Sequence, residues 1–308
     1  MVVKMSIDSV KKTQAGFVAI VGRPNVGKST LLNKLLGQKI AITSRKPQTT
    51  RHNLLGIFTE DNLQAIFIDT PGIHSGGKKQ LNRQMNRAAR KSMIDTDVII
   101  QVVESGKITA EDIKIMEQTV EIKLPKICVI NKIDRIGNKE KLLAEIAEIA
   151  QKNSWQEIIP ISAEKGQNTD AIIKVLNSLL PQREWIFPED QITTAGMRYL
   201  CAELIREKLF RYLHQEVPYE LGVIIEGYKE LKGMVKIDAN IIVERESQKA
   251  IVIGKNASVL KAVGTAARIE LEKELEQKVL LKTFVSVKNN WRDNAEIIAN
   301  MNKGGEMD

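Results

Sequence analysis

The segment GRPNVGKS, residues 22 to 29, constrains this chain more than any other feature. It follows the apolar run FVAIV at 17 to 21 and opens a helical pattern at 28 to 37. A phosphate-binding P-loop needs this order, because amides at the helix start bind phosphate and glycines let the backbone approach it. We expect the Lys28 ammonium to reach the β- and γ-phosphates and the Ser29 hydroxyl to bind Mg²⁺.

Short apolar runs alternate with amphipathic stretches along the first half of the chain. Buried strands are predicted at 17–21, 65–68, 98–103, 127–130 and 158–161, with an edge strand at 53–59. Helices are predicted at 28–37, 80–94, 111–123, 139–152 and 168–180. This alternation is typical of a doubly wound, mostly parallel α/β sheet.

The tetrapeptide DTPG, 69 to 72, comes directly after the strand predicted at 65–68. At that strand end Asp69 would hold Mg²⁺, directly or through water, and the Gly72 amide would contact the γ-phosphate. The polar segment SRKPQTTRHN before it has the character of a switch loop, in which Thr50, or else Thr49, would complete the Mg²⁺ shell. The predicted catalytic residues are Lys28, Thr50, Asp69 and Gly72, and the predicted Mg²⁺ ligands are Ser29, Thr50 and Asp69.

The segment NKID, 131 to 134, follows the apolar run ICVI and selects the base. The Asp134 carboxylate can accept from guanine N1–H and the 2-amino group, whereas adenine would leave it without these partners. Asn131 would tie this segment to the P-loop, and the Lys132 stem would cover the base. In SAE, 162 to 164, the Ala163 amide would lie near guanine O6. The motifs together predict a site for GTP and GDP with Mg²⁺.

The predicted nucleotide-binding residues come from these four motifs and from Thr30, which follows the first of them. They are Gly22, Arg23, Pro24, Asn25, Val26, Gly27, Lys28, Ser29, Thr30, Asp69, Thr70, Pro71, Gly72, Asn131, Lys132, Asp134, Ser162 and Ala163. Ile73 follows DTPG where Ras-type enzymes carry the glutamine that orients the attacking water. Since isoleucine cannot do this, we expect slow hydrolysis that is accelerated by a partner or by K⁺ bound through Asn25.

The pattern changes after Leu180. The segment Pro181 to Thr193 has two prolines and no clear period, and residues 182–194 are the predicted linker between a domain at 16–181 and a smaller α+β domain at 195–292. Residues 1–15 are a predicted N-terminal extension and 293–308 a C-terminal tail, disordered from about Asn300. In the second domain, helices are predicted at 195–214 and 257–276, and strands at 221–228, 234–244, 250–253 and 279–287.

The composition of the chain argues against a membrane-spanning, an exported or a disulfide-rich protein. Among 308 residues, 43% are hydrophobic and 27% charged, and no apolar run reaches the length of a membrane span. The N-terminus lacks the pattern of an export signal, and two cysteines are too few for a disulfide framework, so we expect a cytoplasmic protein. The net charge of +8 alone is a weak indication of an anionic partner. Residues 247 to 268, however, contain four basic residues and no acid.

The motifs GRPNVGKS, QTTR, DTPG, NKID and SAE together resemble the bacterial GTPases that assist ribosome assembly. Four further segments, FPEDQIT, IREKLFRYLHQEVPYE, IIVERESQKAIVIGK and VSVKNNW, are similar to the Era family among them. The resemblance covers roughly residues 15 to 292. It implies a P-loop GTPase domain followed by a type II KH domain that binds single-stranded ribosomal RNA near the 3′ end of 16S rRNA and supports maturation of the 30S subunit. It also implies some peripheral association with the cytoplasmic face of the inner membrane, and we expect a monomer.

A KH domain clamps nucleotides at a GXXG loop, which corresponds here to GKNA, Gly254 to Ala257. Ala257 replaces the second glycine, and its methyl group fits if this residue is already helical. Without the surrounding match, the loop would be read as an ordinary helix N-terminus. The predicted RNA-binding residues are Lys249, Gly254, Lys255, Asn256, Ala257 and Lys261.

Two other functions remain open from the sequence: an RNA-binding scaffold that uses GTP only as a structural ligand, and a GTPase of another pathway such as tRNA modification. The three histidines have no metal-ligand spacing, and Trp155, Trp185 and Trp291 are interpreted as packing residues. The apolar positions of the helix at 195–214 fit either a core stripe or a membrane surface.

Overall fold

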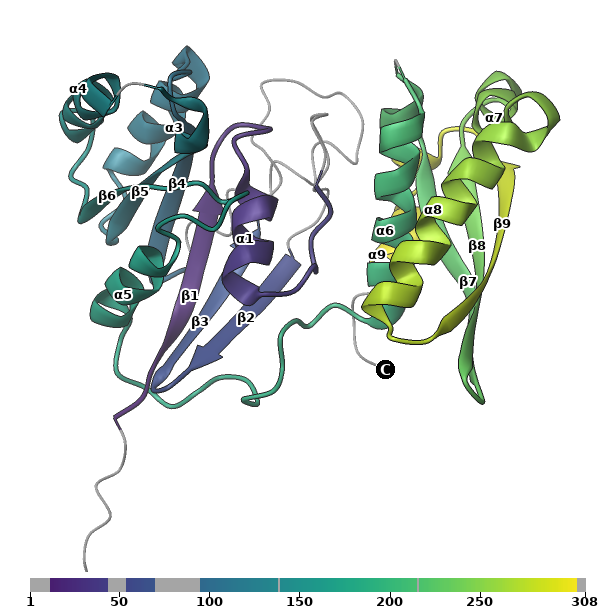
Figure 1. Ribbon diagram of the computed structural model, residues 1–308, viewed down its shortest axis with the longest axis horizontal. Helices are drawn as coiled ribbons and strands as arrows, with labels where there is room; N and C mark the ends of the chain where they lie inside the picture. Colours follow the sequence, from purple (N-terminus) through teal and green to yellow (C-terminus); the bar gives the residue numbers. More distant parts are fainter. Residues whose placement is uncertain (1–11, 44–53, 70–94, 138, 215, 304–308) are drawn as a thin grey trace, which may run out of the picture.

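Two separate β-sheets organise the chain, one in each half (Figure 1). The computed structural model describes residues 12–43, 54–69, 95–137, 139–214 and 216–303. The helix predicted at 80–94 therefore lies outside the described residues.

The first sheet has six strands in the order β2-β3-β1-β4-β5-β6. All neighbours are parallel except the edge strand β2, which is antiparallel to β3. The mostly parallel sheet and its edge strand are thus confirmed. The strands are β1 (Gln14–Val21), β2 (Leu54–Glu60), β3 (Leu63–Asp69), β4 (Val98–Glu104), β5 (Lys126–Asn131) and β6 (Glu157–Pro160).

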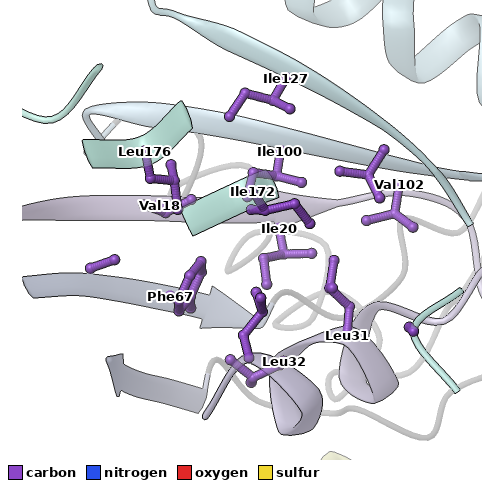
Figure 2. Packing of buried hydrophobic residues seen from close by; sticks show 14 of the residues in the cluster. Val18, Ile20, Leu31, Leu32, Phe67, Ile100, Val102, Ile127, Ile172 and Leu176 are labelled. Atoms are coloured by element: carbon purple, nitrogen blue, oxygen red, sulfur yellow. The ribbon is translucent and has the colours of Figure 1, made fainter. Parts of the chain in front are cut away.

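Helices cover both faces of this sheet. On one face, α1 (Lys28–Leu36) and α5 (Asp170–Leu179) pack against Val18, Ile20 and Phe67 in the largest apolar cluster of the domain (Figure 2). On the other face, α3 (Ala110–Val120) and α4 (Lys139–Ala150) cover the alternate side chains of β1, β4 and β5. The central strands are apolar on both sides because both sides are covered, which confirms the doubly wound fold.

The segment after α5 pairs with the first sheet instead of crossing open space. Gln182 forms a β-bridge with Gln14, and the Ile57 amide donates to the Ile192 carbonyl over 2.7 Å. The Gln64 side chain, fully buried, accepts hydrogen bonds from the amides of Ile186 and Phe187 at 2.8 and 2.9 Å. These contacts hold the predicted linker along β2 and β3.

The second sheet has the order β7-β8-β9, formed by β7 (Gly222–Leu231), β8 (Met234–Val243) and β9 (Lys278–Val287). β7 is antiparallel to β8, and β9 is parallel to it. Three helices pack on one face: α6 (Met197–Tyr212), α7 (Glu246–Ile253) and α8 (Ser258–Glu274). The core stripe of α6 is confirmed, because Leu204, Ile205 and Leu209 are buried in this cluster.

Two predictions for the second half are wrong. Residues 250–253 belong to α7 and not to a strand: Val252 is buried against the sheet, while Ile251 is half exposed. The C-terminal tail contains a helix, α9 (Ala295–Lys303), which includes residues after Asn300 that we expected to be disordered. Ile298 of α9 is 2% exposed and packs against Trp291, so apolar contact holds this helix on the sheet.

Candidate nucleotide and RNA sites

The P-loop connects β1 to α1 at the carboxyl ends of the parallel strands (Figure 1). Gly22 and Gly27 have φ of +150° and +105°, which side-chain-bearing residues rarely adopt. A Cβ at Gly22 would lie 2.4 Å from the Val102 carbonyl oxygen, and one at Gly27 would lie 2.3 Å from Asn131 Nδ2. Both glycines are therefore required by close approach as well as by conformation.

The Lys28 side chain folds back over the loop. Its Nζ donates to the carbonyl oxygens of Gly22 and Arg23 at 2.8 and 3.0 Å, and the residue is 6% exposed. Burial lowers the pKa of Lys28 to about 8, and the carboxylate of Asp69 opposes this only in part. The buried ammonium thus has its charge incompletely compensated by protein groups, which suits a site for a polyphosphate.

The proposed Mg²⁺ ligands meet at the ends of two elements. Ser29, in the first turn of α1, donates from Oγ to Oδ2 of Asp69, the last residue of β3, over 2.8 Å. Asp69 is fully buried. A hydroxyl and a carboxylate at this distance are hard oxygen donors of the kind that Mg²⁺ prefers.

The NKID segment is bonded directly to the P-loop, as predicted for Asn131. Its Nδ2 donates to the Val26 carbonyl over 2.8 Å, and its Oδ1 accepts from the amides of Lys132 and Ala163 at 2.7 and 2.9 Å. Lys132 Nζ donates to the Asn25 carbonyl over 2.6 Å. One buried amide side chain therefore fixes three loops relative to one another.

Asp134 and Ser162 lie side by side at the expected base position. Ser162 Oγ donates to Asp134 Oδ1 over 2.5 Å, which orients the carboxylate. Asp134 is exposed, so a bound base would have to supply the burial on which the predicted guanine selectivity depends. The Ala163 amide donates to Asn131, and its proposed contact with guanine O6 stays a prediction.

Two acids that the sequence reasoning missed support this region. Glu104, the last residue of β4, contacts Lys132 Nζ at 3.0 Å, and Asp112 of α3 accepts from Arg23 Nε at 2.9 Å. Burial alone would raise the pKa of Glu104, but the hydrogen bond and charge of Lys132 outweigh it and the pKa is lowered. The Arg23 side chain is thus held by α3 and β4. The only sequence signal was that Glu104 ends a strand beside the loop.

The other predicted residues divide into two groups. Pro24 and Thr30 lie in the P-loop and the first turn of α1, partly exposed, and Val26 is buried beneath the loop. The second group lies outside the described residues, so its predicted roles stay predictions; it comprises Thr49, Thr50, Thr70, Pro71, Gly72 and Ile73.

The GKNA loop joins α7 to α8. Gly254 has φ +73°, and a Cβ there would lie 2.6 Å from Val259 Cγ2. Asn256 and Ala257 both have left-handed backbones, with φ of +53° and +59°, so Ala257 does not have the helical backbone under which its methyl group was expected to fit. Of the predicted RNA-binding residues, Lys255, Asn256 and Lys261 are exposed beside the loop, and Lys249 of α7 is half-buried.

A cluster of ion pairs joins the two domains beside α6, the helix on the side of the second domain that faces the first (Figure 1). Lys39, shortly after α1, contacts Glu207 of α6 at 2.6 Å and also pairs with Glu270 of α8. Thr43 Oγ1 donates to Glu207 over 3.3 Å. Glu207 is fully buried, so this contact is part of the interdomain packing.

The two cysteines and Trp291 are packing residues. Cys128 and Cys201 are free and buried, and burial raises the pKa of Cys201 to about 12. Trp291 is fully buried and donates to the Glu220 carbonyl over 3.0 Å, as expected for a packing residue. Within the described residues, no group of three His, Cys, Asp or Glu side chains could hold a metal ion. Among these same residues, no helix has the length and apolar character needed to cross a bilayer.

Comparison with known proteins agrees with this geometry. Residues 17–132 match the model of a family described as 50S ribosome-binding GTPase, and residues 216–292 match the KH domain. GTPase Era of Pseudomonas fluorescens is 48% identical, with 95% of this chain and 97% of that protein covered. GTPase Era of Yersinia pestis is 46% identical, with 96% and 98% covered.

Two solved structures cover 96% of this chain and all of their own. One is described as Era in complex with MgGDPNP and nucleotides 1506–1542 of 16S ribosomal RNA, with a TM-score of 0.89 and 41% identity. The other is a single-residue variant of Aquifex aeolicus Era bound to GDP.AlF4⁻, with a TM-score of 0.90 and 40% identity. Fold and site thus define a P-loop GTPase with a C-terminal KH domain. The chain belongs to the Era family of GTPases.

Proposed function

We propose that this chain is a GTP-hydrolysing switch protein that binds the 3′ region of 16S rRNA through its KH domain and assists maturation of the 30S subunit. The observation that carries the nucleotide half is the set Lys28, Ser29, Asp69 and Asn131, in which Lys28 and Asn131 donate to P-loop carbonyls and Ser29 donates to Asp69. The P-loop alone would not distinguish this activity from that of a kinase or an ATPase, and the Asp134 carboxylate, bonded to Ser162, supplies the distinction.

The residues present fit GTP and Mg²⁺. Ser29 and Asp69 would hold the ion, and Gly22 and Gly27 let the loop backbone approach Val102 and Asn131 where a Cβ would collide. When bound, Mg²⁺ neutralises charge that develops on the phosphates. The role of Lys28 is to hold its ammonium at the phosphates, and that of Asp134 is to accept from the guanine edge with Ser162 fixing its orientation.

A further part of the proposal concerns the rate. With isoleucine at position 73, no side chain there can orient water, so turnover is slow without an activator. Asn25, exposed at the tip of the P-loop, is the candidate for a K⁺ site. Equal hydrolysis rates in K⁺ and Na⁺ buffers would eliminate K⁺ as the activator and leave a macromolecular partner.

The RNA half rests on the KH match and on the basic GKNA loop with its exposed Lys255 and Lys261. The solved Era complex contains a 16S rRNA segment, and 16S rRNA belongs to the small subunit. The family description that mentions the 50S subunit matches the GTPase domain alone. We therefore assign the small subunit. The protein is proposed to be cytoplasmic and monomeric, with some peripheral association with the inner membrane.

The test measures phosphate release from GTP by the purified chain, and binding of an RNA that covers nucleotides 1506–1542. Ser29→Ala should lower Mg²⁺-dependent hydrolysis by roughly 100-fold, while Ser178→Ala, on the exposed face of α5, should not change it. Lys255→Glu should weaken RNA binding and leave hydrolysis intact. A chain that binds GTP and RNA but releases no phosphate would instead be a scaffold that uses GTP as a structural ligand.

A further inference from the structure

The outer face of the second sheet, opposite the helices, carries a stripe of alternating lysine and apolar side chains. On β9 the odd positions Val279, Leu281 and Val285 pack into the helix-covered core. The even positions therefore point to the other face. These are Lys278, Leu280, Lys282 and Phe284, all exposed, with Leu280 and Phe284 each 42% exposed.

One end of this face is already covered. Trp291 and Ile298 pack on Ile242 of β8, and a Cβ at Gly222 would lie 2.1 Å from Cε of Met301 in α9. The helix and the tryptophan thus cover the end of the face where β7 begins and β8 ends. The other end, formed by the β7–β8 turn and the first two thirds of β9, keeps its apolar side chains on the surface, including Leu231 at 49% exposure.

The charges of the open end favour an anion. Lys229 and Lys236 lie directly opposite each other in the β7–β8 ladder, an arrangement that is destabilising unless an anion lies near. Asp238 pairs with Lys236 at 3.3 Å. Lys278 and Lys282 have no carboxylate within ion-pair distance among the residues that the structure describes. Lysines that alternate with an exposed aromatic on a sheet are suited to phosphates and stacked bases.

The GKNA loop lies towards the end of the sheet where β8 and β9 end, and the open end of this face is the other end, where β9 begins. β9 is the edge strand of the sheet, and both α7 and α8 pack against it (Figure 1). An RNA strand that leaves the loop can cross this edge and reach Phe284 and Lys282 on the same strand. A KH loop clamps only about four nucleotides, so a longer RNA must lie on other protein surfaces or remain free.

We propose that the stripe Lys278, Leu280, Lys282 and Phe284, together with Lys229 and Lys236, is a second RNA-binding surface. It binds the RNA that flanks the segment held at GKNA, with the lysines on phosphates and Phe284 under a base. This inference rests on the proposed RNA-binding function and adds a second contact region to it.

The experiment compares two RNAs on the full-length chain. The long RNA covers nucleotides 1506–1542 of 16S rRNA, and the short one is a single strand of about six nucleotides from its 3′ end, enough for the KH loop alone. Lys278→Gln/Lys282→Gln should lower the affinity for the long RNA roughly 10-fold. It should also reduce the slope of log affinity against log salt concentration by about 1.5. Phe284→Ala should weaken it roughly 10-fold without changing the slope. The short RNA should bind all variants equally.

Control variants distinguish the effect of this surface on RNA binding from a general effect of lost positive charge and from unfolding. Lys114→Gln/Lys152→Gln removes two exposed lysines of the first domain and should leave both RNAs unaffected. Lys255→Glu, in the loop, should weaken both RNAs. All substituted side chains on β9 are exposed, and melting temperatures within about 2 °C of the parent would show that the fold is kept.

Each other outcome decides against the proposal. If the parent binds both RNAs and the β9 variants bind the long RNA as tightly as the parent, the second surface is wrong while the KH function stands. If the parent binds neither RNA, the proposed RNA-binding function itself fails. If the variants keep RNA binding but lose sedimentation with anionic lipid vesicles, the face is a membrane contact and the RNA assignment is overturned.

Discussion

Asn131 donates from its side-chain amide to the Val26 carbonyl over 2.8 Å, so the base-recognition segment and the P-loop are joined by protein atoms alone. Asn131 is 2% exposed and also accepts from Lys132 and Ala163. Base selection and phosphate binding are therefore parts of one hydrogen-bonded unit.

Asn131→Ala should disrupt this unit. It leaves a buried carbonyl and two amides without their partner, each worth about 1–3 kcal/mol. We expect GTP affinity to fall by roughly 100-fold and the first domain to lose about 3 kcal/mol of stability or more. Titration calorimetry and thermal unfolding measure the two effects. Asn177→Ala, exposed on α5, is the matched control. An affinity within about three-fold of the parent would contradict the proposed role of Asn131.

Lys28 should make GTP binding depend on pH. Its pKa in the free protein is lowered to about 8, so part of the population carries a neutral amine above pH 8. A triphosphate favours the ammonium, so binding should take up a fraction of a proton above about pH 8, and affinity should fall as pH rises.

Calorimetry in two buffers with different ionisation enthalpies measures this proton uptake. Lys28→Arg carries a side chain that stays charged throughout this range and should show no uptake from this position. Equal uptake by the parent and by Lys28→Arg would assign the proton to another group.

The interdomain cluster should contribute to stability. Lys39→Ala removes the partner that contacts Glu207 at 2.6 Å, and Arg211 remains as a second partner at the same distance. We expect a loss of about 2 kcal/mol, below the roughly 3–5 kcal/mol of a fully buried pair, because Lys39 is 24% exposed. Thermal unfolding measures it, and Lys152→Gln is the surface control. Additive effects of Lys39→Ala and Glu207→Gln would contradict direct coupling.

The Glu207 carboxylate should also make the stability of the protein depend on pH in the acid range. Burial would raise the pKa of Glu207, but the hydrogen bond and charge of Lys39, with Arg211 and Lys208, outweigh burial and the pKa is lowered. A lowered carboxyl pKa contributes stability above the ordinary value of about 4.3 that is lost as pH falls. The stability difference between the parent and Glu207→Gln should therefore shrink below about pH 4. A difference that stays constant from pH 7 to 3 would show that Glu207 is not charged in the folded state.

Ala257→Gly should stabilise the KH domain slightly. The left-handed backbone at φ +59° costs alanine about 1 kcal/mol relative to glycine. The more flexible unfolded chain offsets about half of that gain. We expect a net gain of about 0.5 kcal/mol and RNA binding that is equal or tighter, measured by denaturant unfolding and by fluorescence anisotropy. A loss of stability would mean that the alanine methyl group makes favourable contacts that outweigh the strain.

The sequence predicted the first domain well because each strand and loop there has its own signal. Fully apolar strands indicate a sheet that is covered on both faces, and a P-loop indicates a strand followed by a helix. It failed at 250–253, since a short run of β-branched residues does not distinguish a strand from a buried helix, and packing of Val252 on the sheet decides for α7. It also missed α9, although Asn294 caps it by accepting from the amides of Glu296 and Ile297.

The ion pairs between distant segments could not be predicted. Neither the pairing of Arg23 with Asp112 nor that of Lys39 with Glu207 leaves any mark on local sequence patterns, because each joins elements far apart in the chain. The left-handed conformation of Ala257 could not be predicted from the sequence either, because alanine favours a right-handed helix.

The central claim is that Asp134 makes this P-loop protein specific for guanine nucleotides. Its most direct test is the affinity of Asp134→Asn for GTP and for XTP, whose base carries a carbonyl in place of the 2-amino group. An asparagine amide can donate to that carbonyl, so GTP affinity should fall by roughly 100-fold or more while XTP affinity rises above that of the parent. A variant that still prefers GTP over XTP by the parent's ratio would contradict the assignment of Asp134 as the guanine-reading residue.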